Sequence, residues 1–341
     1  MSFSDEDQYA ADVQKVNVAT GRYETQNRGG LNTQEWYTDL QGNVRIGQGR
    51  RDLNGKWQLI VRRAGEEFFD EPKDYPGLKA NSSIVGFTEN PDEIIIARRN
   101  GKNTLGLSIY NLAEKRFTRE LFSHPKYDVQ DVLYSNDGEK LIGARYTSTH
   151  SEIEFFDADE KALMSEISAN AAGYNIRFLD QTSDKNKTLV WATSADEPSL
   201  LLLYNKTTKA LDFLGSAYPG LKDVEPAYVQ AVKYTARDGQ KIPAFVTIPS
   251  KAANAGQIKS LPYIVLPHGG PHSRDSLSFD YMAQMLASRG YGVLQMNFRG
   301  STGYGLDFLQ AGRESWSLMH NDVEDGTKWL VEQGYADADR I

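Results

Sequence analysis

Two adjacent glycines after a short apolar run are the residues of this chain best suited to chemistry. Residues 263–266 are apolar and lead into a Pro-His-Gly-Gly-Pro turn that contains Gly269 and Gly270. Glycine lets a ligand approach the backbone closely and tolerates positive φ. A backbone N–H held about 3 Å from a developing oxyanion stabilises the charge. We therefore predict that Gly269 and Gly270 contribute to an oxyanion hole.

The elements around this turn follow the order in which an α/β-hydrolase begins. A helical spacing of apolar residues over 279–289 precedes a second apolar run, residues 292–296, and a glycine-rich segment, residues 297–305. In that fold the nucleophile follows on a Gly-x-Ser-x-Gly elbow. No such elbow occurs in the 341 residues. We therefore expect no catalytic residue in this chain, a catalytic triad after Ile341, and no activity of the chain alone.

Three other polar residues near the turn are weaker candidates. The triad order on this fold is serine, acid, histidine, so His268 precedes the elbow and is expected to shape the loop. Ser301 follows a strand between glycines, but its context is not Gly-x-Ser-x-Gly. Arg299 is a candidate for binding a substrate carbonyl or carboxylate, and a structural salt bridge is the favoured alternative.

Composition narrows the functional classes. The net charge of −8 provides no basic surface for nucleic acid. The absence of Cys excludes a disulfide framework, Cys-ligated zinc and a Cys nucleophile. The acidic N-terminus lacks the apolar segment of a signal peptide, and no run approaches the roughly 18 apolar residues of a membrane helix. We expect neither nucleic acid nor a membrane as partner, and the compartment stays open between the cytoplasm, which is favoured, and the periplasm.

Residues 1–225 read as repeats of short strands joined by Asp-Gly-like turns. Phe156 lies 46 residues after Tyr110, and Tyr204 lies 48 residues after Phe156, at corresponding places in successive units. This period is typical of four-stranded β-propeller blades. We predict about five blades, the first starting within a blade, so that the propeller is incomplete. A β-sandwich with chance periodicity is the alternative.

The pattern changes near residue 226. A β-hairpin is predicted around the Arg-Asp-Gly turn at residues 237–239, and residues 250–260 are expected to form a polar loop. Strands at 263–266 and 292–296 alternate with helices at 279–289 and from about residue 322 to 333. Alternating strands and helices indicate a parallel sheet with covering helices. The predicted domains are therefore a propeller over 1–225 and the N-terminal part of an α/β-hydrolase domain over 226–341, which stops before the nucleophile elbow.

These motifs together resemble the prolyl oligopeptidase family of serine peptidases, in its acylaminoacyl-peptidase and dipeptidyl-aminopeptidase-like branch. The resemblance rests on Leu-Pro-His-Gly-Gly-Pro-His at 266–272, Asn-Phe-Arg-Gly-Ser-Thr-Gly-Tyr-Gly at 297–305, and the helix and turn at 329–334. It implies a seven-bladed propeller over a hydrolase domain with a Ser-Asp-His triad, and it makes Gly270 the oxyanion donor. Because this chain has fewer blades and no triad, it resembles an internal fragment of such an enzyme.

The resemblance also brings up the adjacent pair Glu66 and Glu67. In the dipeptidyl branch, paired glutamates hold a substrate ammonium group. Neighbouring residues on a strand point to opposite faces, so both carboxylates converge only on a helix or a bulge. The surrounding sequence reads as a strand, and we interpret the pair as surface charge.

The function predicted from these observations is that of a serine peptidase acting on short peptides. The alternatives are a non-catalytic propeller that binds proteins, with a vestigial hydrolase half, and a carboxylesterase, which shares the fold and the oxyanion loop. No metal spacing, phosphate loop or dinucleotide fingerprint is found, so no cofactor is expected. Short peptides are the expected substrates, and a homo-oligomer is left open.

Overall fold

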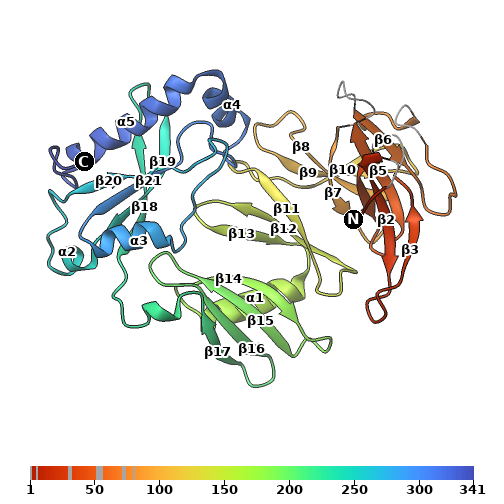
Figure 1. The fold of residues 1–341 in the computed structure, drawn as a ribbon, viewed down its shortest axis with the longest axis horizontal. Helices are drawn as coiled ribbons and strands as arrows, with labels where there is room; N and C mark the ends of the chain where they lie inside the picture. The colour runs from red at the N-terminus through yellow and green to blue at the C-terminus, as the bar shows by residue number, and fades with distance from the viewer. Residues whose placement is uncertain (1, 5–6, 30–32, 51–56, 71–73, 80) are drawn as a thin grey trace. The chain divides into compact units, whose positions relative to one another are not determined.

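The computed structural model describes residues 2–4, 7–29, 33–50, 57–70, 74–79 and 81–341 (Figure 1). The chain forms two compact units. The first comprises Met1–His124 with Asp131–Ala144, and the second comprises Pro125–Gln130 with Arg145–Ile341. No helix within the described ranges is both long enough and apolar enough to span a membrane.

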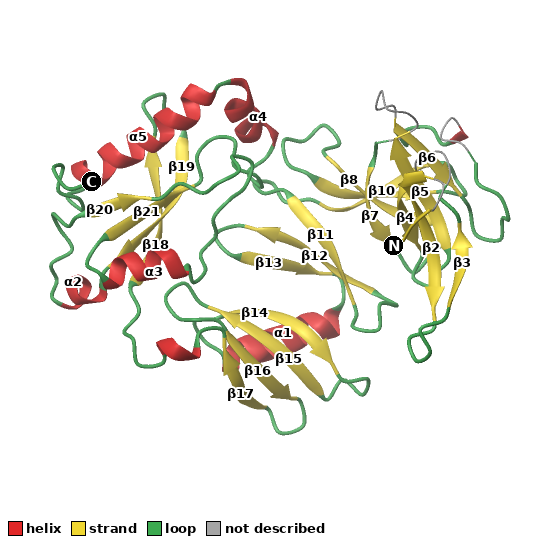
Figure 2. Cartoon of the chain, in the orientation of Figure 1, coloured by secondary structure: helices red, strands yellow, loops and turns green. Residues whose placement is uncertain are grey.

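The first unit is built from antiparallel sheets in which consecutive strands are neighbours, drawn as arrows in Figure 2. Its three sheets have the orders β1-β2-β3, β4-β5-β6 and β10-β9-β8-β7. Their strands are β1 (Ser2–Ser4), β2 (Asp7–Val16), β3 (Tyr23–Asn27), β4 (Thr33–Thr38), β5 (Val44–Arg50), β6 (Trp57–Val61), β7 (Ser83–Phe87), β8 (Glu93–Arg98), β9 (Gly106–Asn111) and β10 (Arg116–Phe122). Strands that follow one another along the chain therefore pair with one another, as in a β-meander.

The core of this unit lies between β5, β6, β8 and β9. Ile46, Ile94 and Tyr110 are fully buried in one apolar cluster. A buried ion pair closes the turn before β5, since the Asp39 carboxylate accepts hydrogen bonds from Asn43 N at 2.8 Å and from Arg45 Nε at 2.7 Å. The Asx-type turn therefore satisfies its own buried polar groups.

Two further antiparallel sheets follow along the chain. The chain passes between the two units within the sheet β11-β12-β13, formed by β11 (Val129–Tyr134), β12 (Leu141–Thr147) and β13 (Ser151–Phe155). The next sheet, β14-β15-β16-β17, belongs to the second unit and comprises β14 (Asn175–Gln181), β15 (Lys187–Thr193), β16 (Leu200–Asn205) and β17 (Ala210–Ser216). A 3₁₀ turn, Pro219–Leu221, follows β17.

These sheets are the blade-like units that the residue spacing predicted. Tyr110 lies in β9 and Tyr204 in β16, each on the third strand along the chain of its own sheet, and Phe156 directly follows β13, the third strand of the sheet between them. Both tyrosines are fully buried. The predicted count of about five blades, the start within a blade and the domain boundary at residue 225 stay predictions.

Helix α1 (Ala158–Asn170) was not predicted. It begins after Asp157, whose side chain accepts a hydrogen bond from Glu160 N at 2.8 Å and caps the helix. Leu163 and Ile167, one turn apart, pack with Val190 of the adjacent sheet. The helix therefore covers part of the β14–β17 sheet (Figure 2).

The remaining sheet of the second unit has the order β18-β19-β21-β20. Its strands are β18 (Tyr228–Thr235), β19 (Lys241–Ile248), β20 (Tyr263–Val265) and β21 (Gly292–Met296). β20 and β21 run parallel, whereas β19 is antiparallel to both β18 and β21. β21 is buried along its whole length, as expected for a central strand covered on both faces.

Helices cover both faces of this sheet: α3 (Tyr281–Ser288) lies against one face and α5 (Trp316–Glu332) against the other (Figure 1). Tyr234 of β18 donates its hydroxyl hydrogen to Asp322 O at 2.6 Å. A Cβ at Gly326 would lie 2.9 Å from the tyrosine ring, so glycine permits this close packing of α5.

The helix predictions need three corrections. The helix predicted from about residue 322 begins at Trp316, because Met319 extends the buried stripe by one turn toward the N-terminus. Helix α4 (Leu306–Glu314) was not predicted. The predicted polar loop over 250–260 begins with a short helix, α2 (Ser250–Asn254).

Candidate functional site

The Pro-His-Gly-Gly-Pro turn lies at the carboxyl end of β20. Because β20 and β21 are parallel, the segments that follow them, residues 266–272 and 297–305, leave the sheet at the same edge. Open α/β sheets bind ligands at this edge. The structure therefore brings the two predicted glycine-rich segments together.

Gly270 has a backbone conformation and surroundings that require glycine. Its φ is +131°, and a Cβ built on it would lie 2.8 Å from His272 N. Gly269 differs, because nothing lies within 4 Å of a Cβ built there. In the described part of the chain, no acceptor takes a hydrogen bond from either glycine N–H. Both glycines are exposed, so these donors are accessible to a ligand.

His268 is fixed by a ring stack and a buried hydroxyl. Its ring stacks on Phe298 with centroids 4.5 Å apart, and its Nε2 lies 2.8 Å from Ser301 Oγ. Ser301 Oγ also lies 2.6 Å from Phe298 O, and His268 Nδ1 lies 2.9 Å from Gly269 O. Through the His268–Ser301 hydrogen bond the loop after β20 is tied to the loop after β21.

Ser301 is placed as a structural hydroxyl. Its side chain is fully buried, and its oxygen lies 2.6 Å from the backbone carbonyl of Phe298. A nucleophile needs an exposed oxygen and a base that removes its hydrogen. The buried oxygen of Ser301 does not meet the first of these requirements.

His272 also has a structural place. Its Nδ1 lies 3.0 Å from Gly300 O and must donate to it, while Arg313 Nε lies 3.4 Å from its Nε2. Both contacts are satisfied by the neutral ring with the hydrogen on Nδ1. His272 therefore forms a second connection between the two glycine-rich segments.

Arg299 is bound by two carboxylates. Its Nη2 lies 2.6 Å from Asp322 Oδ1, and it also pairs with Asp238 in the turn between β18 and β19. The hydrogen bonds that Arg299 donates to Asp322 and to Asp238 raise the pKa of Arg299, and Arg299 in turn lowers the pKa of Asp238. The residue is 5% exposed. Its guanidinium therefore forms a structural ion pair, which is the alternative to a substrate-binding role.

Glu66 forms an ion pair with Arg63 in the segment between β6 and β7. Glu67, its neighbour, is exposed. The segment around the pair is an irregular turn and not the predicted strand, and neither residue belongs to the unit that contains Gly270.

A buried network of polar groups around Arg274, next to the loop 266–272, was not predicted. Arg274 donates to Thr147 O at 3.0 Å and to Ser148 O at 2.6 Å. Its Nη2 lies 2.8 Å from the Tyr304 hydroxyl, and its Cζ lies 4.1 Å from the centre of the Tyr304 ring. A Cβ at Gly303 would lie 2.5 Å from Arg274 Nη1, so glycine leaves room for the guanidinium.

Asn297 connects this network to the start of the loop after β21. Its Nδ2 donates to Asp275 O at 3.0 Å and to the Tyr304 hydroxyl at 2.8 Å, and its Oδ1 accepts from Asp275 N at 2.7 Å. Burial raises the pKa of Tyr304 and of Asp275. The two glycine-rich segments are therefore held by side chains on both sides of the exposed glycines.

The sequence offers only a weak signal for this network. Arg274 and Asn297 stand out as polar residues beside glycine-rich turns, but their partners include backbone carbonyls more than 120 positions away. Only the folded backbone identifies such acceptors. Among the described residues, no group of three or more His, Cys, Asp or Glu side chains is placed to hold a metal ion.

Comparisons with known proteins agree with this arrangement. Residues 277–341 match the model of the prolyl oligopeptidase family. Dipeptidyl aminopeptidase BIII of Pseudoxanthomonas mexicana is 27% identical over 346 aligned residues, which cover 100% of this chain and 50% of the relative. The acylamino-acid-releasing enzyme of Sus scrofa is 30% identical over 119 residues, or 34% of this chain and 15% of that enzyme.

Solved structures extend the likeness to the fold. A puromycin-hydrolyzing peptidase of Mycobacterium tuberculosis superimposes with a TM-score of 0.63 at 16% identity, over 93% of this chain and 49% of that one. The predicted fold class, β-propeller sheets followed by a sheet of α/β-hydrolase type, is confirmed. This chain spans half or less of the length of these relatives. It is related to the serine peptidases of the prolyl oligopeptidase family.

Proposed function

We propose that this chain supplies the oxyanion loop of a serine peptidase that acts on short peptides, of the acylaminoacyl- or dipeptidyl-peptidase type. The observation that carries the proposal is Gly270: an exposed N–H without an acceptor in the described chain, at the carboxyl edge of the sheet, in a conformation that requires glycine. The relatives named as dipeptidyl and acylamino-acid peptidases support the substrate class.

In the proposed mechanism, a serine activated by a histidine attacks the scissile carbonyl. The carbonyl oxygen becomes an oxyanion and accepts a hydrogen bond from Gly270 N–H, with Gly269 beside it. Collapse of the tetrahedral intermediate expels the amine, which takes the proton from the histidine, and water then hydrolyses the acyl-enzyme. The 341 residues hold no Gly-x-Ser-x-Gly elbow, so the proposed serine, acid and histidine lie outside them.

The loop needs no rearrangement to act as such a donor. His268 and His272 each bond across to the loop after β21, so Gly269 and Gly270 sit between two fixed points. Preorganised donors cost no reorganisation during the reaction and are therefore effective in stabilising a transition state.

The test is to compare the 341-residue chain with the full product of its gene, using a fluorophosphonate probe and chromogenic acyl-peptide and dipeptide substrates. We expect the full product to be labelled and to hydrolyse one substrate class, and the 341-residue chain to do neither. A folded full product without labelling or hydrolysis would contradict the proposal. If the 341-residue chain is labelled and Ser301→Ala abolishes the labelling, Ser301 is the nucleophile and the proposal is wrong.

A further inference from the structure

A pocket in the second unit differs in charge from the rest of the chain. It has a volume of about 500 Å³ and lies between the loop 125–130, the turn after β12, the β18–β19 hairpin and α4. Three lysines line it: Lys126, Lys233 and Lys241. None of the described residues that line it is an aspartate or a glutamate. A cationic lining is unexpected in a chain of net charge −8.

Two of these lysines offer their charge to a ligand. Lys233 and Lys241 are exposed side chains on facing strands of the hairpin, near its turn. Lys241 Nζ donates to the neutral hydroxyl of Thr235. An anion entering the pocket would therefore meet these two ammonium groups, whose fields add in a concave site.

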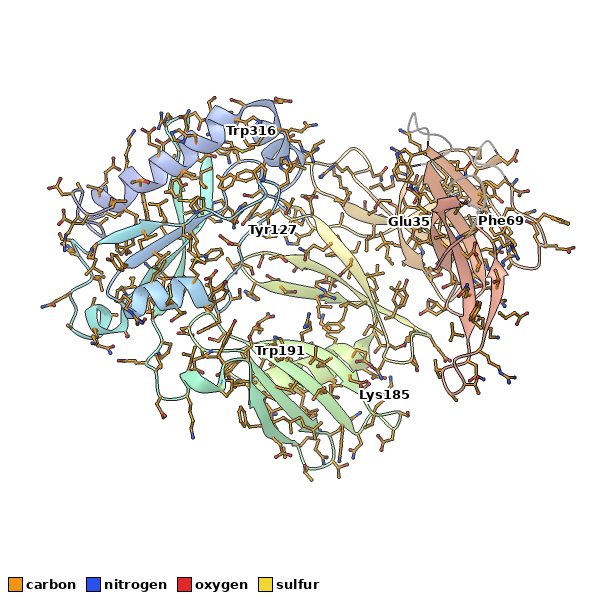
Figure 3. All side chains as sticks on the ribbon, viewed as in Figure 1. Glu35, Phe69, Tyr127, Lys185, Trp191 and Trp316 are labelled. Carbon is orange, nitrogen blue, oxygen red and sulfur yellow. The ribbon has the colours of Figure 1, made fainter. Side chains whose placement is uncertain are left out.

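The inner wall of the pocket is aromatic. Tyr127, labelled in Figure 3, meets Tyr304 edge to face with ring centroids 6.1 Å apart, and Tyr304 lies 5.2 Å from the Phe308 ring. Arg274 stacks on Tyr304 and fixes that ring. Concave sites of roughly 300–1,000 Å³ with an apolar wall and a few convergent polar groups are typical of small-ligand sites.

We propose that this pocket binds the carboxylate of a short peptide or acylated amino acid that carries an aromatic side chain. The carboxylate would lie beside Lys233 and Lys241, and the ring would pack against the Tyr127–Tyr304–Phe308 wall. The volume fits a ligand of one or two residues. The proposed peptidase function supports the choice of a peptide carboxylate, whereas the charge and shape of the pocket are independent of it.

Calorimetric titration of the 341-residue chain tests this directly, because binding needs no catalytic residue. The probes are N-acetylphenylalanine, its amide, which keeps the ring and removes the charge, and N-acetylglycine, which keeps the charge and removes the ring. We expect N-acetylphenylalanine to bind at least roughly tenfold more tightly than either of the others, since a charged hydrogen bond is worth a factor of this order.

The variant Lys233→Ala/Lys241→Ala should weaken binding of N-acetylphenylalanine by roughly tenfold or more, and raising the salt from 50 to 500 mM should weaken it in the wild type. Lys259→Ala, which removes an exposed lysine outside this pocket, is the matched control and should bind as the wild type does. Thermal melts of all variants identify any that fail to fold. A folded Tyr127→Leu variant should lose the preference for the aromatic probe.

Equal binding of the acid and the amide, or unchanged binding by the folded double lysine variant, would overturn the proposal. So would the absence of wild-type binding at millimolar concentrations. If the pocket binds but the full gene product hydrolyses nothing, the proposed function fails and the pocket stands. If the product hydrolyses peptides but the pocket binds no carboxylate, the reverse holds.

Discussion

The imidazole of His268 and the hydroxyl of Ser301, 2.8 Å apart, join the two loops that leave the carboxyl edge of the α/β sheet. The hydroxyl also lies 2.6 Å from Phe298 O, so the imidazole, the hydroxyl and the carbonyl form one chain of hydrogen-bonding groups. Each member of such a chain depends on its neighbour for a satisfied partner.

Removing the Ser301 hydroxyl should destabilise the fold. In Ser301→Ala, His268 Nε2 and the carbonyl of Phe298 both lose a partner, and an unsatisfied buried group costs about 1–3 kcal/mol. Urea unfolding of the 341-residue chain should show a loss in that range. The control is Ser278→Ala, which removes an exposed hydroxyl and should change stability by less than about 0.5 kcal/mol. Equal stability of both variants would mean that the chain of bonds contributes nothing.

Arg274 should be irreplaceable even by lysine. Its planar group reaches two carbonyls and a hydroxyl at once and stacks on Tyr304, which an ammonium does not reproduce. We expect Arg274→Lys to lower the free energy of unfolding by about 1–3 kcal/mol. The matched substitution Arg289→Lys, at an exposed arginine, should have little effect. The measurement is urea denaturation of both variants followed by far-UV circular dichroism.

The two glycines of the loop should respond differently to alanine. In Gly270→Ala the Cβ meets His272 N at a φ that side chains rarely adopt, so the loop must shift, at a cost of about 1–3 kcal/mol. Gly269→Ala has open space around the new methyl group and should fold like the wild type.

In the full gene product, the same Gly270→Ala change should lower kcat by roughly 10²–10³ through the displaced donor. Steady-state kinetics are measured at 10 °C, and a thermal melt checks that the Gly270→Ala protein is folded at this temperature. A folded Gly270→Ala protein with wild-type kcat would show that this N–H is not an oxyanion donor.

Acid stability should depend on the contact between the β18–β19 turn and α5. The hydrogen bond from Arg237 lowers the pKa of Asp325 in the folded protein. A carboxyl with a depressed folded pKa contributes stability above its unfolded pKa of about 3.9 and loses it as the pH falls through the folded value.

The wild type should therefore lose stability below about pH 4 more steeply than Asp325→Asn does. Asp223→Asn, at an exposed aspartate, should follow the wild-type curve. Unfolding free energies measured at half-unit intervals from pH 7 to pH 2.5 decide this. Parallel curves for the wild type and Asp325→Asn would contradict the expectation.

The sequence predicted the parts of the fold whose signals are local. Glycine turns, apolar runs and the 46–48 residue spacing identify the strands, and the apolar spacing over 279–289 identifies helix α3, whose cap at Asp280 is seen in the structure. Helix α1 was missed because its buried residues, Glu160, Leu163 and Ile167, include a charged one and form no continuous apolar stripe. Helix α4 follows a glycine-rich turn so closely that the two read as one loop.

The residues of the candidate site likewise divide into those that the sequence identifies and those that only the structure identifies. Gly269 and Gly270 are recognisable because the chemistry needs glycine next to a strand end. The Arg274 contacts are not recognisable, because carbonyl oxygens carry no residue identity. For Arg299, sequence alone could not choose between a ligand and an ion pair, and the choice depends on Asp322, which lies 23 positions away on a helix.

The contacts of the segment after Gly270 have a consequence for how the site moves. Arg274 binds the carbonyls of Thr147 and Ser148, and Leu277 N donates to Thr149 O at 2.6 Å. Local opening of this segment must break all three bonds together, so it forms one cooperative unit with the turn after β12. Its amide protons should exchange with solvent at the rate of that turn, even though the glycines beside it are exposed. We therefore expect the loop to combine an accessible surface with a backbone that opens only together with that turn.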